Sequence, residues 1–288
     1  MTNSSITLLN SSIIKISGSD TKKFLQGLIT NDINKASNQN LIYSAMLSPK
    51  GRFLYDFIIF ENDQDIYLDC ASDRCDEIVK KFGFYKLRMD VTIEKIEDII
   101  IAQSFEKING DQELFFISSD PRSDKMGYRI YLNKSQLDNF ILQDTKQYHE
   151  IRIKNKIPEG EYDLTFDKSL ILEFGFNDFN AVDYEKGCYV GQELTARTHH
   201  LGQVRKQIFL VSFEGDIESD PTVPDRETSN LILNLKNTEI THEQNKIGKI
   251  LSVIKLDNIN YSLALLKSDA ISEINSASIL GHKLTIIS

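Results

Sequence analysis

The stretch Lys186-Gly187-Cys188-Tyr189-Val190-Gly191-Gln192-Glu193 gathers two glycines, a thiol, a cation and a carboxylate in one short run. The two glycines can adopt backbone angles that other residues avoid, so we expect a sharp loop that carries the cysteine. The residues from Gln192 to Thr198 favour a helix, and the positive end of its dipole would then lie near the thiol, with Lys186 adding charge. Both effects would lower the pKa of Cys188, although a buried structural cysteine fits the pattern equally well.

The N-terminal half contains a predicted β-hairpin. Residues 41–47 and 53–60 both have strand-like sequences, and residues 48–51, Ser-Pro-Lys-Gly, place Pro and Gly where a tight turn needs them. The second arm is almost wholly apolar, which is typical of a central strand, so Asp56 within it needs a partner. That partner is either a structural ion pair or a ligand.

The order of the predicted elements indicates a mixed α+β fold. A strand at 12–16 precedes a helix that carries Phe24 and Leu28, and further helices are predicted near 78–85 and 143–153, with strands irregularly between them. This order lacks the regular alternation of a doubly wound parallel sheet. The chain contains neither GxGxxG nor GxxxxGKS/T, which argues against a dinucleotide or P-loop nucleotide cofactor.

The part of the chain beyond Gly202 is predicted to be almost entirely strand. The expected strands are 204–213, 230–235, 247–256, 259–266 and 283–287. Short strands at even spacing predict a small barrel or sandwich. We therefore predict two domains, an α+β domain over 1–203 and a β-barrel domain over 204–288.

Length and charge restrict the functional classes. A chain of 288 residues exceeds what a single core usually organises, and a net charge of −9 disfavours broad nonspecific binding to nucleic acid. Arg197, Arg205 and Lys206, near His199 and His200, form the best local candidate for a contact with tRNA or another RNA. No apolar run approaches the roughly 20 residues that span a bilayer, so we expect no membrane role.

The cysteines and the N-terminus bear on metal binding and compartment. Cys70, Cys75 and Cys188 fit neither a disulfide framework nor paired CxxC zinc ligands, and the two adjacent histidines point apart, so we expect no metal site and a reducing compartment. Residues 1–5 do not form a cationic region ahead of an apolar core, and the first arginine is Arg52. These features predict a cytoplasmic protein.

The segment 186–200 closely resembles the signature of the YgfZ-type folate-binding proteins, and its extension through the two histidines is similar to the branch that includes the mitochondrial iron-sulfur assembly factor. Residues 16–20, 24–27, 29–33 and 47–52 add to the resemblance. These proteins are related to the aminomethyltransferase of the glycine cleavage system, whose fold wraps ferredoxin-like α+β units around a folate cleft and adds a C-terminal β-barrel. The resemblance implies the same fold here, with two ferredoxin-like halves in the first domain.

The resemblance also implies a function. It suggests binding of tetrahydrofolate or a one-carbon-substituted derivative and a role in maturing or repairing iron-sulfur enzymes, including tRNA methylthiotransferases, together with cluster-assembly proteins. On this basis the candidate catalytic residues are Cys188, Lys186 and Asp56. The candidate folate-binding residues are Asn31, Asp32, Arg52, Tyr189, Gln192, Glu193 and Arg197.

Two other functions stay open. Aminomethyltransferases carry a pair of aspartates where this chain has Tyr55-Asp56, so an accessory role is favoured over one-carbon transfer, in which Asp56 would orient or deprotonate the attacking amine. A non-enzymatic RNA or protein adaptor would instead use Arg197, Arg205 and Lys206. Its RNA binding would weaken steeply with salt.

Overall fold

The computed structural model describes residues 4–108, 114–202, 204–215, 232–233, 237–269 and 277–287. Within these ranges no helix is both long enough and apolar enough to cross a membrane. The chain forms two compact units that interleave along the sequence. The first comprises Met1–Asp144, Phe166–Lys168 and Phe176–Ala196, and the second comprises Thr145–Thr165, Ser169–Gly175 and Arg197–Ser288. A domain boundary at residue 203 stays a prediction.

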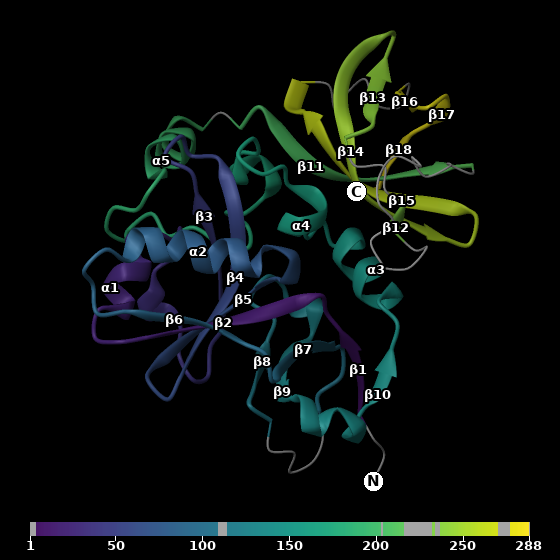
Figure 1. Cartoon of the computed structure of the whole chain (residues 1–288). Helices are drawn as coiled ribbons and strands as arrows, with labels where there is room; N and C mark the ends of the chain where they lie inside the picture. Colours follow the sequence, from purple (N-terminus) through teal and green to yellow (C-terminus); the bar gives the residue numbers. More distant parts are fainter. Residues whose placement is uncertain are drawn as a thin grey trace. The chain divides into compact units, whose positions relative to one another are not determined.

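A five-stranded antiparallel sheet organises the first unit, with the strand order β3-β4-β5-β2-β6. Its strands are β2 (Ser11–Ser17), β3 (Ile42–Leu47), β4 (Phe53–Asn62), β5 (Asp65–Ala71) and β6 (Thr92–Ile96). The helices α1 (Thr21–Gln26) and α2 (Cys75–Lys86) lie against this sheet (Figure 1). Their buried faces and the sheet share one apolar core, which includes Leu25, Phe57 and Phe82.

The predicted hairpin is confirmed. Strands β3 and β4 pair from Ile42–Ile59 to Leu47–Phe53, and the N–H of Gly51 donates to the carbonyl of Ser48 at 2.8 Å. As expected for an apolar strand, β4 is central, between β3 and β5.

The second sheet of this unit has the order β10-β1-β7-β9-β8, in which only β1 and β10 run parallel. Its strands are β1 (Ser5–Leu8), β7 (Ile99–Ser104), β8 (Phe116–Ser119), β9 (Tyr128–Asn133) and β10 (Ile141–Gln143). Short 3-10 helices connect the elements of the unit: η1 (Ile33–Lys35), η2 (Ser72–Arg74), η3 (Asp124–Met126) and η4 (Lys134–Asn139).

A layer of aromatic and charged side chains joins the two sheets of the first unit. The ring of Phe60 on β4 stacks on Phe116 with centroids 4.2 Å apart. Nearby, the buried carboxylate of Asp69 pairs with Arg129 at 2.7 Å and accepts a hydrogen bond from the hydroxyl of Tyr131 at 3.1 Å. The first sheet is therefore covered on both faces, by helices on one and by the second sheet on the other.

The second unit is built on a curled antiparallel sheet with the order β17-β16-β13-β14-β15-β11-β18, to which β12 adds beside β14. Its strands are β11 (Lys206–Glu214), β12 (Ile232–Leu233), β13 (Glu239–His242), β14 (Asn245–Leu256), β15 (Ile259–Lys267), β16 (Ser278–Ile279), β17 (His282–Lys283) and β18 (Thr285–Ile287). A mixed α+β fold followed by a curled, strand-rich part confirms the predicted fold class.

A buried ionic network ties the helices of the second unit to its sheet. The helices are α3 (Lys146–Lys154), α4 (Gly160–Asp163), η5 (Ile171–Phe174) and α5 (Gln192–Leu201), whose first five residues belong to the first unit. Arg152 on α3 donates to Asp163 on α4 at 2.9 Å, and Asp163 accepts from the N–H of Ser252 on β14 at 2.9 Å. The ion pair is fully buried, so the two charges rely on each other and on the surrounding hydrogen bonds, such as that from Arg152 to the hydroxyl of Ser252 at 2.7 Å, in place of water.

Candidate functional site

Lys186 fastens the signature loop, residues 186–193, to the segment that follows α1. Its Nζ donates to the carbonyl oxygen of Ile29 at 2.6 Å and to that of Asn31 at 2.8 Å. Burial lowers the pKa of Lys186 to about 8, and the nearby carboxylates of Asp32 and Asp183 oppose this shift. The ammonium group therefore acts as a clamp between two distant parts of the sequence.

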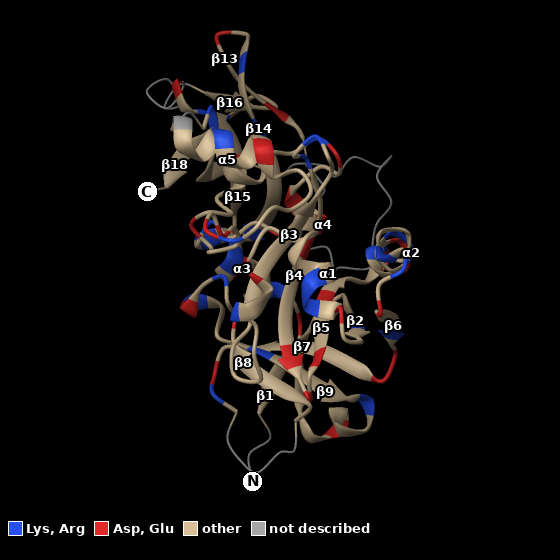
Figure 2. Cartoon of the chain, turned by 90° about the vertical axis from the view of Figure 1, so that its left-hand side faces the viewer, with Lys and Arg blue, Asp and Glu red and all other residues tan. Residues whose placement is uncertain are grey.

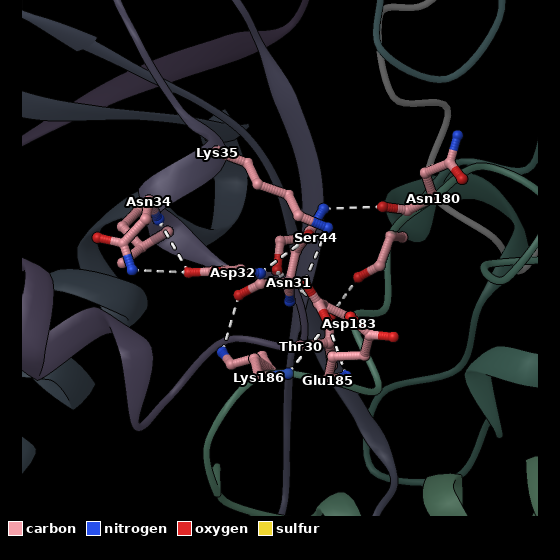
Figure 3. Close-up of polar contacts among 12 residues, drawn as sticks. Thr30, Asn31, Asp32, Asn34, Lys35, Ser44, Asn180, Asp183, Glu185 and Lys186 are labelled. Carbon is pink, nitrogen blue, oxygen red and sulfur yellow. Dashed lines mark hydrogen bonds and ion pairs between the residues drawn. The ribbon is translucent and has the colours of Figure 1, made fainter.

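Asp183 anchors the entry to the loop (Figure 3). Its Oδ1 accepts hydrogen bonds from the N–H groups of Glu185 at 2.8 Å and Lys186 at 3.0 Å, and its Oδ2 pairs with Lys35 at 2.7 Å. The hydrogen bond from Lys35 holds the pKa of Asp183 below its usual value. Because the N–H of Asp183 also donates to the carbonyl of Thr30, this residue is bound through both its backbone and its side chain.

Asn31 is buried beneath this clamp. Its Nδ2 donates to the carbonyls of Tyr43 at 2.8 Å and Asn180 at 2.7 Å, and its N–H donates to the hydroxyl of Ser44 at 3.0 Å. Neighbouring Thr30 donates its hydroxyl to the carbonyl of Ala181 at 2.6 Å. The two residues therefore join the hairpin strand β3 to the chain just ahead of the signature loop.

Two glycines bring the hairpin turn and the signature loop into backbone contact. Gly51 and Gly191 have φ angles of +71° and +83°. A Cβ on Gly191 would lie 2.3 Å from the carbonyl oxygen of Ser48, and one on Gly51 would lie 2.8 Å from Cβ of Leu194. Gly187 has no positive φ, and a Cβ there would meet nothing within 4 Å. Of the two loop glycines that were expected to need special backbone angles, this holds only for Gly191.

The end of the loop is held by hydrogen bonds that its backbone N–H groups donate. As predicted, α5 begins at Gln192, whose Oε1 accepts from the N–H of Tyr189 at 3.0 Å while its own N–H donates to the Tyr189 carbonyl. The N–H of Val190 donates to the carbonyl of Gly27 at 3.0 Å. Between these fixed points, Cys188 is an exposed free thiol.

Asp56 lies on β4 in a second polar group of the first unit. Its Oδ2 accepts a hydrogen bond from the hydroxyl of Tyr43 at 2.8 Å. The Tyr43 ring lies under the guanidinium of Arg122, 6.0 Å from the centroid, and against the ring of Phe176 at 5.1 Å. Arg122 is itself paired with buried Asp120 at 2.7 Å. The group thus combines a half-buried carboxylate, two aromatic rings and a positive charge.

The other predicted binding residues lie on several elements of the chain. Asp32 caps η1 by accepting from the N–H of Asn34, and Arg52 donates to the carbonyl of Lys168 at 3.0 Å. Glu193 and Arg197 are exposed on α5. In the portion of the chain that the structure describes, no three His, Cys, Asp or Glu side chains gather as metal ligands.

Sequence reasoning missed several residues of these two groups. Asp183 precedes Lys186 by three positions, and an Asp in a turn commonly accepts from backbone N–H groups two or three residues later, so its role was detectable. Tyr43 and Arg122 come from separate parts of the sequence, and no local pattern marks them. Their role depends on how the two sheets pack.

One family model and one solved structure show the class of fold to which the chain belongs. A family model described as the GCVT N-terminal domain matches residues 8–102. The glycine cleavage system aminomethyltransferase T from Bartonella henselae has a similar structure, with a TM-score of 0.73 over 99% of this chain and 85% of that chain. At 12% sequence identity, this likeness shows a shared fold.

Sequence relatives define the family more narrowly. The mouse protein named iron-sulfur cluster assembly factor IBA57, mitochondrial, is 31% identical over 242 residues, which cover 74% of this chain and 67% of the mouse chain. The Dictyostelium discoideum homologue is 30% identical over 292 residues, covering 81% and 72%. The chain belongs to the IBA57 family. It spans about half of the Mycosarcoma maydis homologue, with 34% identity over 55% of that protein.

The relatives correct the predicted localisation. Each of these proteins is named as mitochondrial, which contradicts the prediction of a cytoplasmic protein. The prediction was wrong because it relied on the first residues of the sequence, whereas the similarity to mitochondrial proteins extends over most of the chain.

Proposed function

We propose that this protein is an accessory factor for the maturation of iron-sulfur proteins in mitochondria, and that it binds tetrahydrofolate or a one-carbon derivative. The names of its relatives support the first part, and its aminomethyltransferase-like fold supports the second. The observation that carries the proposal is an exposed thiol, Cys188, on a loop whose backbone is fixed on both sides. We include tRNA-modifying methylthiotransferases among the proposed clients.

The loop exposes the thiol of Cys188. The clamp at Lys186 and the close approach of Gly191 to the hairpin turn hold the backbone on either side of Cys188. A sulfur atom on a rigid support loses little conformational freedom when it meets a partner. Cys188 is therefore suited to brief contact with a sulfur species or cluster carried by another protein.

The residues around Asp56 fit a pterin chemically. The partly exposed carboxylate of Asp56 suits the hydrogen-bond donors of an aminopyrimidine edge, and the buried rings of Tyr43 and Phe176 pack together beside it. The guanidinium of Arg122, which is paired with Asp120, lies over the Tyr43 ring. Tetrahydrofolate would supply a nucleophilic amine that carries a one-carbon unit. Asp56 would hold the pterin, and the Tyr43 hydroxyl would orient that carboxylate.

Calorimetric titration with tetrahydrofolate tests the folate part of the proposal. We expect saturable binding to the whole chain, weakened at least about tenfold by Asp56→Asn through loss of a charged acceptor. Asp138→Asn, at an exposed position, is the matched control. Absence of heat at high folate concentration would refute folate binding, and turnover of one-carbon donors that disappears in Asp56→Asn would identify a transferase instead.

The thiol part is tested in cells that depend on this protein. Cys188→Ala should lower the activities of mitochondrial iron-sulfur enzymes, while the abundance and melting temperature of the purified variant stay unchanged because the thiol is exposed. A Cys188→Ala variant that supports every such enzyme as well as the wild type would exclude a thiol mechanism.

A further inference from the structure

The C-terminal half of α2 carries an apolar and basic surface that the proposed function does not use. Phe84 is 71% exposed and Leu87 is 84% exposed, although both are large apolar residues. The opposite face of the same helix is buried through Ile78 and Phe82. Because α2 packs on the core through the face with Ile78 and Phe82, the exposed side chains of Phe84 and Leu87 contribute little to the core of the unit.

The backbone at Leu87 is unusual for its residue type. Its φ of 50° and ψ of −115° are those of the first central position of a type II′ turn, and the N–H of Met89 donates to the carbonyl of Lys86 to close that turn at 3.0 Å. Glycine dominates this position because a side chain is strained there. A leucine held in such a conformation, and pointed at solvent, suggests a function for its side chain.

Gly83 gives an independent indication. It lies within α2 next to Phe84, where glycine weakens a helix relative to alanine. A Cβ at this position would meet nothing within 4 Å, and its backbone has no positive φ, so neither packing nor conformation inside the unit requires glycine. A glycine beside exposed anchors leaves a flat site that another molecule can approach closely.

The charges around these residues indicate what that molecule is. The segment from Ile78 to Met89 contains no Asp or Glu, in a chain whose net charge is −9. Figure 2 shows Lys and Arg residues along α2 in blue. The basic residues of the segment are Lys80, Lys81, Lys86 and Arg88. Apolar anchors within a charged rim are the usual anatomy of a protein interface.

We propose that Lys80, Gly83, Phe84 and Leu87 form a docking surface for an acidic protein partner, one that offers an apolar pocket for Phe84 and Leu87 and carboxylates for the surrounding cations. Single-stranded RNA is disfavoured because only one of the two anchors, Phe84, has a ring on which a base can stack, and the net charge of −9 repels a polyanion. An anionic membrane is disfavoured because its extended charge would also meet the acidic remainder of the chain.

The test uses two synthetic helical peptides as probes, one with leucines on one face and glutamates on the other, and a second with lysines in place of the glutamates. Titrated into the isotope-labelled whole chain, the acidic peptide should shift the amide signals of Gly83, Phe84 and Leu87. Its affinity should fall as salt rises, and the basic peptide should not bind.

The variants separate docking from folding. Phe84→Ala, Leu87→Gly and Lys80→Glu should each weaken binding of the acidic peptide about tenfold or more. Leu87→Gly should not lower the melting temperature, because glycine suits the turn. The matched control is Leu280→Gly, since Leu280 is also exposed, at 63%, and also has a positive φ, of 47°, but lies in the second unit.

Several results would overturn the proposal. These are equal affinity for both peptides, no binding of the acidic peptide, an equal loss of binding in Leu280→Gly, or a lower melting temperature in Leu87→Gly. Stronger binding to oligouridylate, or to phosphatidylcholine vesicles containing phosphatidylserine, with the same dependence on Phe84 and Leu87, would assign the surface to RNA or to membranes instead.

Discussion

Replacing Gly191 by alanine tests how the signature loop is held. The positive φ of 83° costs an alanine about 1–2 kcal/mol. The new Cβ would also lie 2.3 Å from the carbonyl oxygen of Ser48. That oxygen cannot move away freely because it accepts from the N–H of Gly51, so displacing it loses roughly one hydrogen bond, about 1 kcal/mol. Alanine also restricts the unfolded chain more than glycine does, which stabilises the folded state by about 0.4–1 kcal/mol.

The net loss for Gly191→Ala is therefore about 2 kcal/mol, or roughly 4–8 °C in the melting temperature of a unit of this size. Gly187→Ala is the matched control, because that glycine is in the same loop with open space around it, and we expect a change within about 0.5 kcal/mol. Urea unfolding followed by tyrosine fluorescence suits this chain, which has no tryptophan. Equal stability of the two variants would refute the argument that the loop is fixed by backbone contact.

Three further predictions concern buried titratable groups. Lys186 has a pKa of about 8 in the folded chain against its ordinary value of 10.5, so the unfolded chain binds more protons between these two pH values. The free energy of unfolding of the wild type should therefore rise from pH 8 to pH 10.5, and that of Lys186→Met should not. Burial lowers the pKa of His149 to about 3, so its contribution to the free energy of unfolding is complete above pH 6.5 and is lost as the pH falls towards 3. In urea unfolding curves measured over this pH range, the free energy of unfolding of His149→Gln should change less with pH than that of the wild type. Asp163→Ala removes the shorter ion pair of buried Arg152 and leaves the longer one to Glu159, at 3.5 Å, so it should cost about 3–5 kcal/mol by calorimetric melting. Arg152→Met with Asp163→Leu should recover most of that loss.

The strand pattern of the first unit could be predicted because its cues are local. The Pro-Gly turn at residues 48–51 and the apolar arm that follows it specify a hairpin and a central strand without reference to the rest of the chain. The start of α5 at Gln192 was predictable in the same way. The short strand β13, by contrast, was missed because its four residues carry too little periodicity to distinguish a strand from a loop.

The site was only partly predictable because its contacts are made between distant segments. Sequence singled out Lys186 for its charge beside a cysteine, yet its ammonium contacts backbone carbonyls more than 150 residues away. The binding role of Asn31 was implied by the family resemblance and stays a prediction, and its side-chain amide donates to the carbonyls of Tyr43 and Asn180. Polar residues in a sequence carry no sign of whether a ligand or the backbone will satisfy them.

The attachment of the signature loop has a consequence for how substitutions act on it. Hydrogen bonds from the loop and from Asp183 are accepted by the main-chain oxygens of Gly27, Ile29, Thr30 and Asn31. Every amino acid supplies the same oxygen, so a change of residue type in this segment cannot delete an acceptor. Inserting or deleting one residue there would move all four acceptors out of register at once. The docking of the loop thus depends on the spacing of residues 27–31 in addition to the side chains of Thr30 and Asn31, and a scan of single-residue deletions should reveal the requirement for spacing.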